Sequence, residues 1–101
     1  MLTFMNKAGR SQPGLQEVLK QGAIIIDVRS PLEYAAGHIK GSKNIPLDIL
    51  KEHLEDVRNY NKPVITVCQS GMRSGTAKSF LENHGIVALN GGSWLSLNKI
   101  V

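Results

Sequence analysis

Apolar residues along the chain alternate between a pattern typical of buried strands and one typical of helices. Continuous apolar runs of strand length occupy residues 23–28, 63–68 and 86–89. Apolar residues at helical spacing lie outside these runs, at Leu15, Val18 and Leu19, at Leu47, Leu50, Leu54 and Val57, and at Ala77, Phe80 and Leu81. Strands that are apolar on both faces belong to a sheet that is covered on both sides. The alternation with helices of about ten residues therefore predicts an α/β fold, in which a mostly parallel sheet lies between two layers of helices.

Capping and stop signals indicate where several of these elements begin and end. Ser30 is a helix-capping residue type and Pro31 suits the first helical position, so we expect a short helix directly after the first strand. Gly22 and Gly85 follow the first and last helical patterns and are expected to end those helices. The third apolar run is closed by the turn signal Asn-Gly-Gly at residues 90–92.

The length and composition fit one compact domain, predicted to cover residues 1–101. Hydrophobic residues make up 42% and charged residues 20% of the chain, as in ordinary globular proteins. The first ten residues lack the apolar run of a secretory signal. No stretch approaches the roughly 20 apolar residues needed to span a bilayer. We therefore expect a cytoplasmic protein without a membrane partner.

The charged and metal-binding residue types exclude several function classes. The net charge is +4, and the basic residues are scattered rather than gathered in a run, so we do not expect nucleic-acid binding. A mild positive excess favours small anionic substrates. His38, His53 and His84 share no metal-ligand spacing, and a single cysteine excludes an internal disulfide, a CxxC pair and a multi-cysteine zinc site. The sequence therefore predicts no metal site.

The only cysteine, Cys68, ends the second apolar run and is followed by a polar segment. In parallel sheets, ligands bind at the carboxyl ends of strands. Gly71 permits backbone conformations that a β-carbon forbids, and a helix predicted over residues 74–84 directs its free N–H groups back toward the sulfur. These N–H groups, the helix dipole and the charge of Arg73 all favour the thiolate, so the pKa of Cys68 is predicted to fall. The alternative is that Cys68 is a small core hydrophobe.

Three segments carry a resemblance to a known family. They read IIIDVRSPLEYAAGHIKGSKNIPL at residues 24–47, VITVCQSGMRS at residues 64–74 and ALNGGSW at residues 88–94. In this order they resemble the signatures of the rhodanese-like, single-domain sulfurtransferases, over nearly the whole chain. Lys40 and Ser42 depart from that pattern, which often has proline and alanine in these places.

The resemblance implies a three-layer rhodanese-like fold and a reaction at Cys68. The thiolate is expected to attack the sulfane sulfur of a small anionic donor such as thiosulfate and to form a cysteine persulfide. A thiol, cyanide or a sulfur-accepting protein then removes that sulfur. The loop is expected to hold the persulfide, so the predicted substrate-binding residues are Gln69, Ser70, Gly71, Met72 and Arg73. The resemblance implies neither a metal nor an organic cofactor.

Other functions of related folds stay open at this point. A persulfide carrier, or a binding module that delivers sulfur to a protein partner, would use the same residues. A cysteine phosphatase or arsenate reductase requires Cys-x5-Arg, whose arginine binds a tetrahedral oxyanion. Here Arg73 lies one residue too early and Ser74 takes the required position. Arg73 is interpreted either as a residue that orients an anionic donor or as a surface arginine.

Further residues in these segments are assigned structural roles. Asp27 and Arg29 are expected to form a salt link, and Glu33 to cap a helix or pair locally. His38 is interpreted as structural, since a cysteine that is already ionised by its loop needs no general base. Trp94 is interpreted as a partly buried packing residue.

Overall fold

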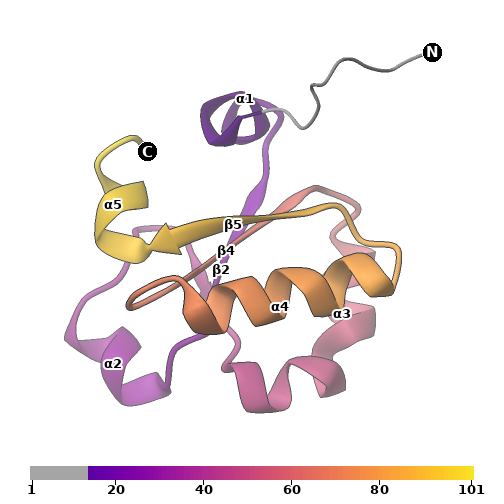
Figure 1. Ribbon diagram of the computed structural model, residues 1–101, viewed down its shortest axis with the longest axis horizontal. Helices are drawn as coiled ribbons and strands as arrows, with labels where there is room; N and C mark the ends of the chain where they lie inside the picture. Colours follow the sequence, from indigo (N-terminus) through magenta and orange to yellow (C-terminus); the bar gives the residue numbers. More distant parts are fainter. Residues whose placement is uncertain (1–13) are drawn as a thin grey trace.

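The structure is a computed structural model and describes residues 14–101 (Figure 1). The helices are α1 (Leu15–Lys20), α2 (Pro31–Ala36), α3 (Leu54–Asn59), α4 (Met72–Asn83) and α5 (Trp94–Asn98), with a 3₁₀ helix, η1 (Leu47–His53), directly before α3. The strands are β2 (Ile24–Asp27), β3 (Lys43–Asn44), β4 (Val64–Cys68) and β5 (Ala88–Ser93). Within the described residues, no helix is both long enough and apolar enough to cross a membrane.

The strands form one parallel sheet in the order β3-β2-β4-β5. Because they all run in the same direction, their last residues meet along one edge, where Asp27 pairs with Asn44 and Cys68 pairs with Ser93. We call this the carboxyl edge, and the opposite edge, where the strands begin, the amino edge. The segments that follow β2, β4 and β5 are thereby brought together at the carboxyl edge.

Helices cover both faces of the sheet, which confirms the predicted three-layer fold. On one face, Leu50 of η1, Val57 of α3 and Leu81 of α4 belong to one apolar cluster with buried strand residues. On the other face, Val18 of α1 and Leu97 of α5 belong to a second cluster. Figure 1 shows α1 and α5 on one side of the strands and α3 and α4 on the other. Every residue of β4 is buried, as expected for a strand between two layers.

Two helical segments differ from the prediction. The apolar residues between Leu47 and Val57 indicated one helix, whereas the structure has η1 followed by α3. Leu47 and Leu50 are three residues apart, which is the repeat of a 3₁₀ helix, so this tighter helix still presents both side chains to the core. Helix α4 begins at Met72 rather than at residue 74, because Gly71 takes the left-handed N-cap conformation, with φ 102°, immediately before it.

The prediction that the last strand covers residues 86–89 and closes at Asn-Gly-Gly is wrong, because β5 spans Ala88–Ser93 and contains that turn signal. Gly91 explains the difference. A β-carbon at this position would lie 2.7 Å from the Ile65 Cγ2 and 3.0 Å from the Thr66 carbonyl oxygen. A glycine therefore lets β5 continue in close contact with β4, and a register shift beside Thr66 accommodates the irregularity.

Candidate active site

Cys68 is the last residue of β4, and several donors are directed at its sulfur. The Gly71 N–H donates to Sγ at 2.9 Å and the Ser74 N–H at 3.4 Å. The Ser74 hydroxyl oxygen lies 3.3 Å from Sγ. Cys68 itself is 0% exposed, whereas the next two residues, Gln69 and Ser70, are exposed. The sulfur therefore lies one short loop below the surface, among donors that point toward it.

The pKa of Cys68 lies below its ordinary value of 9.0. Burial is the largest single influence and raises the pKa, because it disfavours the charged thiolate. The contact with the Ser74 hydroxyl, and hydrogen bonds from the Ser74, Gly71 and Ser70 N–H groups, lower the pKa and together outweigh burial. The site thus favours the thiolate in spite of the depth at which the sulfur lies.

The five residues predicted to bind substrate divide between the loop and the start of α4. Gln69 and Ser70 form the loop, Gly71 is the N-cap, and Met72 and Arg73 are the first two residues of the helix. N–H groups in the first turn of a helix have no carbonyl partner within it. The unpartnered end of α4 therefore lies beside the sulfur, as the sequence indicated, although the helix begins earlier than predicted.

Ser74 and Asn90 form a polar network that the sequence analysis did not identify. The Ser74 hydroxyl donates to the Asn90 Oδ1 at 2.7 Å while it contacts the Cys68 sulfur. The Asn90 Oδ1 also accepts from the Gly92 N–H at 2.9 Å, and its Nδ2 donates to the Gly71 carbonyl at 3.0 Å. Asn90 therefore fixes both the N-cap of α4 and the Ser74 hydroxyl against β5. The only signal in the sequence was a polar residue inside the closing segment.

Arg73 is bonded to Glu33 of α2. Its Nη1 and Nη2 donate to the two carboxylate oxygens at 2.7 and 3.0 Å. Glu33 also accepts from the Ser30 N–H, and the Ser30 hydroxyl accepts from the Glu33 N–H, so the two form a capping box. The bond from Arg73, followed by that from the Ser30 N–H, lowers the pKa of Glu33 to about 2, and Glu33 in turn raises the pKa of Arg73. The predicted capping by Ser30 is confirmed, and Glu33 pairs with the helix that follows the cysteine loop.

A second arginine, Arg29, anchors the segment that follows β2. Its Nη2 pairs with the Asp27 Oδ2 at 2.7 Å, and both residues are buried. The same nitrogen donates to the Gly37 carbonyl at 2.7 Å, and the guanidinium carbon lies 4.7 Å from the centre of the Trp94 ring. The expected salt link is confirmed, and Trp94 packs, partly buried, against the α1 and α5 side of the core.

The histidines make contacts of their own. The His38 Nδ1 lies 2.8 Å from the Tyr34 carbonyl oxygen, and the two rings stack with centroids 3.8 Å apart. The His84 Nδ1 contacts a backbone carbonyl of α4, and His53 contacts an acidic side chain of α3. Among residues 14–101, no three His, Cys, Asp or Glu side chains are grouped as ligands for a metal ion.

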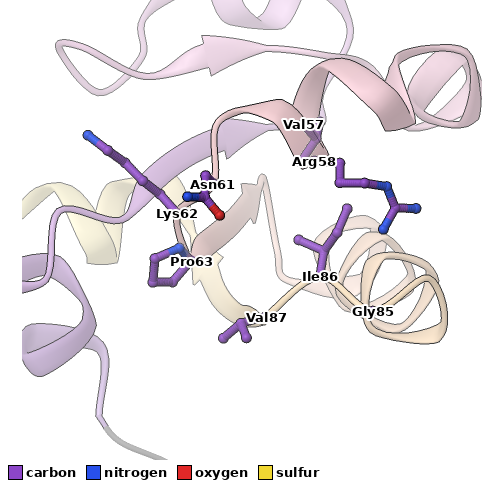
Figure 2. Close-up of a pocket in the computed structure, with 8 residues that line it drawn as sticks. All are labelled: Val57, Arg58, Asn61, Lys62, Pro63, Gly85, Ile86 and Val87. Atoms are coloured by element: carbon purple, nitrogen blue, oxygen red, sulfur yellow. The ribbon is translucent and has the colours of Figure 1, made fainter.

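Two hollows lie at opposite edges of the sheet, each with a volume of about 300 Å³. The hollow at the carboxyl edge reaches the start of α4 and is lined by Val28, Ser30, Pro46, Leu47, Asp48 and Arg73. The hollow at the amino edge, drawn in Figure 2, is lined by Val57, Arg58, Asn61, Lys62, Pro63, Gly85, Ile86 and Val87. It lies next to the start of β4, about 13 Å from Cys68 at the usual rise of a strand, so it is separate from the cysteine site.

Comparison with known sequences places this geometry in a family. The family model described as a rhodanese-like domain matches residues 11–95. The uncharacterized protein YqhL of Bacillus subtilis (strain 168) is 45% identical over 73 residues, which cover 69% of this chain and 57% of that protein. Thiosulfate sulfurtransferase GlpE of Pseudomonas fluorescens is 30% identical over 80 residues, which cover 76% of this chain and 72% of that protein.

Solved structures give the same result. The reduced CoADR-RHD of Bacillus anthracis has a TM-score of 0.71 and 37% identity over 85% of this chain and 15% of its own. A rhodanese with anions from E. coli has a TM-score of 0.67 and 36% identity over 73% of this chain and 89% of its own. The chain thus spans little more than half of YqhL and a small part of CoADR-RHD, and most of the E. coli rhodanese. The chain belongs to the rhodanese-like domain family.

Proposed function

We propose that the protein transfers sulfane sulfur through a persulfide on Cys68. The observation that carries this proposal is the convergence of Gly71 and Ser74 donors on a buried sulfur whose pKa is lowered. A thiolate is the reactive form of cysteine, and donors that stabilise it also stabilise the anion that follows. The likeness to proteins named thiosulfate sulfurtransferase, at about 30% identity, supports the same class of reaction.

In the first step, the Cys68 thiolate attacks the outer sulfur of a donor such as thiosulfate. A bond forms between Sγ and that sulfur, the S–S bond of thiosulfate breaks, and its electron pair leaves with sulfite. The total charge is unchanged, and the protein holds an anionic persulfide. The N–H groups of Met72 and Arg73, in the first turn of α4, are free of partners within the helix and are available to the added sulfur.

In the second step, a nucleophilic acceptor takes the outer sulfur, and the Cys68 thiolate is restored. Cyanide leaves as thiocyanate and a thiolate leaves as a new persulfide. We propose a thiol as the acceptor in the cell, either on a small molecule or on a sulfur-accepting protein. In the second case the protein is a persulfide carrier that uses the same two steps. Neither step requires a metal or an organic cofactor.

The environment of Ser74 argues against a phosphatase or arsenate reductase. Those enzymes place an arginine at this position to bind a tetrahedral oxyanion with two parallel hydrogen bonds. Ser74 is buried, its carbonyl accepts from the Thr66 hydroxyl at 2.8 Å, and its own hydroxyl is held by Asn90. The loop is also one residue shorter, so it suits a single sulfur atom better than a tetrahedral anion.

Intact-mass spectrometry tests the proposal. After incubation with thiosulfate or an organic sulfane donor, the protein should gain the mass of one sulfur, and cyanide should remove it with formation of one equivalent of thiocyanate. The Cys68→Ser variant should gain none. If Cys68 is alkylated normally but accepts sulfur from no donor, the proposal is wrong. Hydrolysis of an aryl phosphate would instead favour the phosphatase.

A further inference from the structure

The positive charges that follow β2 and β4 are neutralised by neighbouring carboxylates. Arg73 is bonded to both carboxylate oxygens of Glu33, and Arg29, which is 2% exposed, is paired with the buried Asp27. The N-terminus of α4 contributes a further partial charge of about half a unit. The thiolate of Cys68 already balances that partial charge. An incoming dianion such as thiosulfate therefore gains little from these groups.

Beside the exposed polar residues Gln69 and Ser70, large apolar side chains are exposed on the segments near the cysteine loop. Leu32 and Met72 are the most exposed large hydrophobic residues within 14–101, at 85% and 80%, and Leu95 is 51% exposed. Leu32 directly precedes Glu33, whose carboxylate accepts from Arg73, and Met72 directly precedes Arg73. Leu95 lies two residues after Ser93, the residue of β5 that pairs with Cys68. Figure 1 shows α2, the start of α4 and α5 on the same side of the molecule.

The hollow beside Arg73 also offers apolar side chains to a ligand. Its volume is about 300 Å³, and its lining includes the apolar side chains of Val28, Pro46 and Leu47. The acidic residue in the lining is Asp48, whose carboxylate repels anions. A small carbon group is therefore better suited to this hollow than a sulfonate group.

We propose that the natural donor carries its sulfane sulfur on an apolar body with at most one negative charge, and that Glu33 determines this preference. Organic persulfides and thiosulfonates are donors of this class. The inference rests on the proposed function and specifies its substrate. Glu33 acts by neutralising Arg73, whose free charge would attract a dianion. With the pair formed, an apolar donor gains contact with Leu32 and Met72, whereas thiosulfate is dehydrated without a counter-charge.

Atoms and charge balance in the same way whether thiosulfate or a thiosulfonate loads Cys68. A thiosulfonate, R–SO2–S⁻, gives its outer sulfur to Sγ, its S–S bond breaks, and the electron pair leaves with the sulfinate R–SO2⁻. The summed charge of thiolate and donor is the same before and after the step. The sulfur is transferred at its own oxidation level, so no oxidant or reductant takes part.

The test compares the loading of Cys68 by thiosulfate and by benzenethiosulfonate. Single-turnover rate constants are measured by quenched intact-mass spectrometry in about 0.1 M salt. Each rate constant is divided by that of the same donor with a small free thiol, N-acetylcysteine, which removes the intrinsic reactivity of the donor. The normalised value for the wild-type protein should be larger for benzenethiosulfonate.

The deciding variant is Glu33→Gln, which frees Arg73 while the side-chain oxygen still accepts from the Ser30 N–H and preserves the cap. One charge about 6 Å away changes the rate about threefold per unit charge of the donor in a water-like medium. We therefore expect the loading rate to rise about tenfold for thiosulfate, which carries two charges, and about threefold for benzenethiosulfonate, which carries one. The ratio of the benzenethiosulfonate rate to the thiosulfate rate should then fall about threefold. Any change in the pKa of Cys68 affects both donors equally and cancels in the ratio.

The matched control is Glu82→Gln, which changes the net charge by the same amount and also frees a cation, because Glu82 pairs with Lys78 at 3.1 Å. Glu82 lies ten residues along α4 from its start, about 15 Å away and beyond the screening length, so the ratio should not change. A second variant, Leu32→Lys, adds a positive charge at an exposed position and should shift the ratio in the same direction as Glu33→Gln.

The outcomes separate the two proposals. The proposed donor preference is wrong if both donors load Cys68 but the ratio is unchanged in Glu33→Gln and Leu32→Lys. It is also wrong if normalised loading of the wild type is faster with thiosulfate. In both cases the proposed sulfur transfer itself is still supported. If neither donor loads Cys68, the transfer itself is wrong and the preference falls with it.

Discussion

The two edges of the sheet carry hollows of similar volume, and each hollow is lined by an arginine, but they differ in how their polar groups are arranged. At the amino edge, Arg58 donates to the His84 carbonyl at 2.9 Å and Lys62 completes a basic lining (Figure 2). At the carboxyl edge, Gly71 and Ser74 direct N–H groups at one buried sulfur. Neither the volume of a hollow nor an arginine in its lining therefore distinguishes the two edges. What distinguishes the carboxyl edge is the convergence of donors on a nucleophile at a strand end, which makes it the candidate site.

The largest expected effect is the loss of sulfur transfer when Cys68, at the carboxyl edge, is replaced. A replacement at the amino edge should leave sulfur transfer almost unchanged. Cys68→Ser should lower turnover by on the order of a thousandfold or more, because the attacking thiolate is gone. Lys62→Ala, at the amino edge, should leave turnover within about twofold. Thiocyanate release in the presence of a sulfane donor and cyanide measures both. A comparable loss in Lys62→Ala would place part of the site at the amino edge.

The second prediction concerns the network that holds the donors in place. Asn90→Ala removes the bonds to the Gly71 carbonyl and the Ser74 hydroxyl, so kcat/KM should fall about tenfold to a hundredfold, at about 1 kcal/mol for each lost bond. Because Asn90 no longer holds Gly71, whose N–H donates to Sγ, the pKa of Cys68 should rise toward its ordinary value, which the pH dependence of its alkylation rate reports. Asn83→Ala, at the exposed end of α4, is the control. An alkylation profile that is unchanged in Asn90→Ala would remove Asn90 from the site.

The third prediction concerns the close contact of β4 and β5 near the carboxyl edge. Gly91→Ala should lower the free energy of unfolding by about 1–3 kcal/mol, because its β-carbon would meet Ile65, Val67 and the Thr66 carbonyl within about 3 Å. Gly14→Ala, which has open space around it, should cost less than about 1 kcal/mol. Urea denaturation measures both. Equal losses in the two variants would show that the strands separate readily at Gly91.

The smallest effect is a difference in the pH dependence of stability. The folded-state pKa of Cys68 is depressed below 9.0, so the native state binds this proton less tightly than the unfolded chain does. The resulting stabilisation is fully present above pH 9.0 and is lost as the pH falls through the folded-state pKa. The free energy of unfolding of the wild type, relative to Cys68→Ser, should therefore grow as the pH rises from neutral toward 9.0. Parallel curves for the two proteins from urea denaturation would contradict the lowered pKa.

Local signals in the sequence were sufficient for the layers of the fold and for the position of Cys68. The apolar run of β4 and the helical spacing in α1 and α4 depend on residues that are close in the chain. The capping role of Ser30 is equally local, since its partner Glu33 is three residues away. These features follow from hydrophobic periodicity and backbone hydrogen bonding, which a single sequence reveals.

The parts that the sequence did not reveal depend on contacts between distant residues. Glu33 and Arg73 are forty residues apart in the chain, and Ser74 and Asn90 are sixteen apart. The extension of β5 through Gly91 depends on the side chains of β4, and β3 has only two residues, too few for a pattern. Arg73 follows Cys68 closely enough in the chain to be expected near the sulfur, but no local pattern points to Glu33 as the carboxylate that neutralises it.

The conformation of Gly71 has a consequence for the speed of the proposed sulfur transfer. Gly71 caps α4, donates to Sγ and is held through its carbonyl by Asn90, so folding of the helix and assembly of the donors are one event. The entropy of ordering the loop is lost during folding, so the proposed loading of sulfur needs no further ordering of these donors. Hydrogen exchange at the Gly71 amide would therefore report directly how often the site opens.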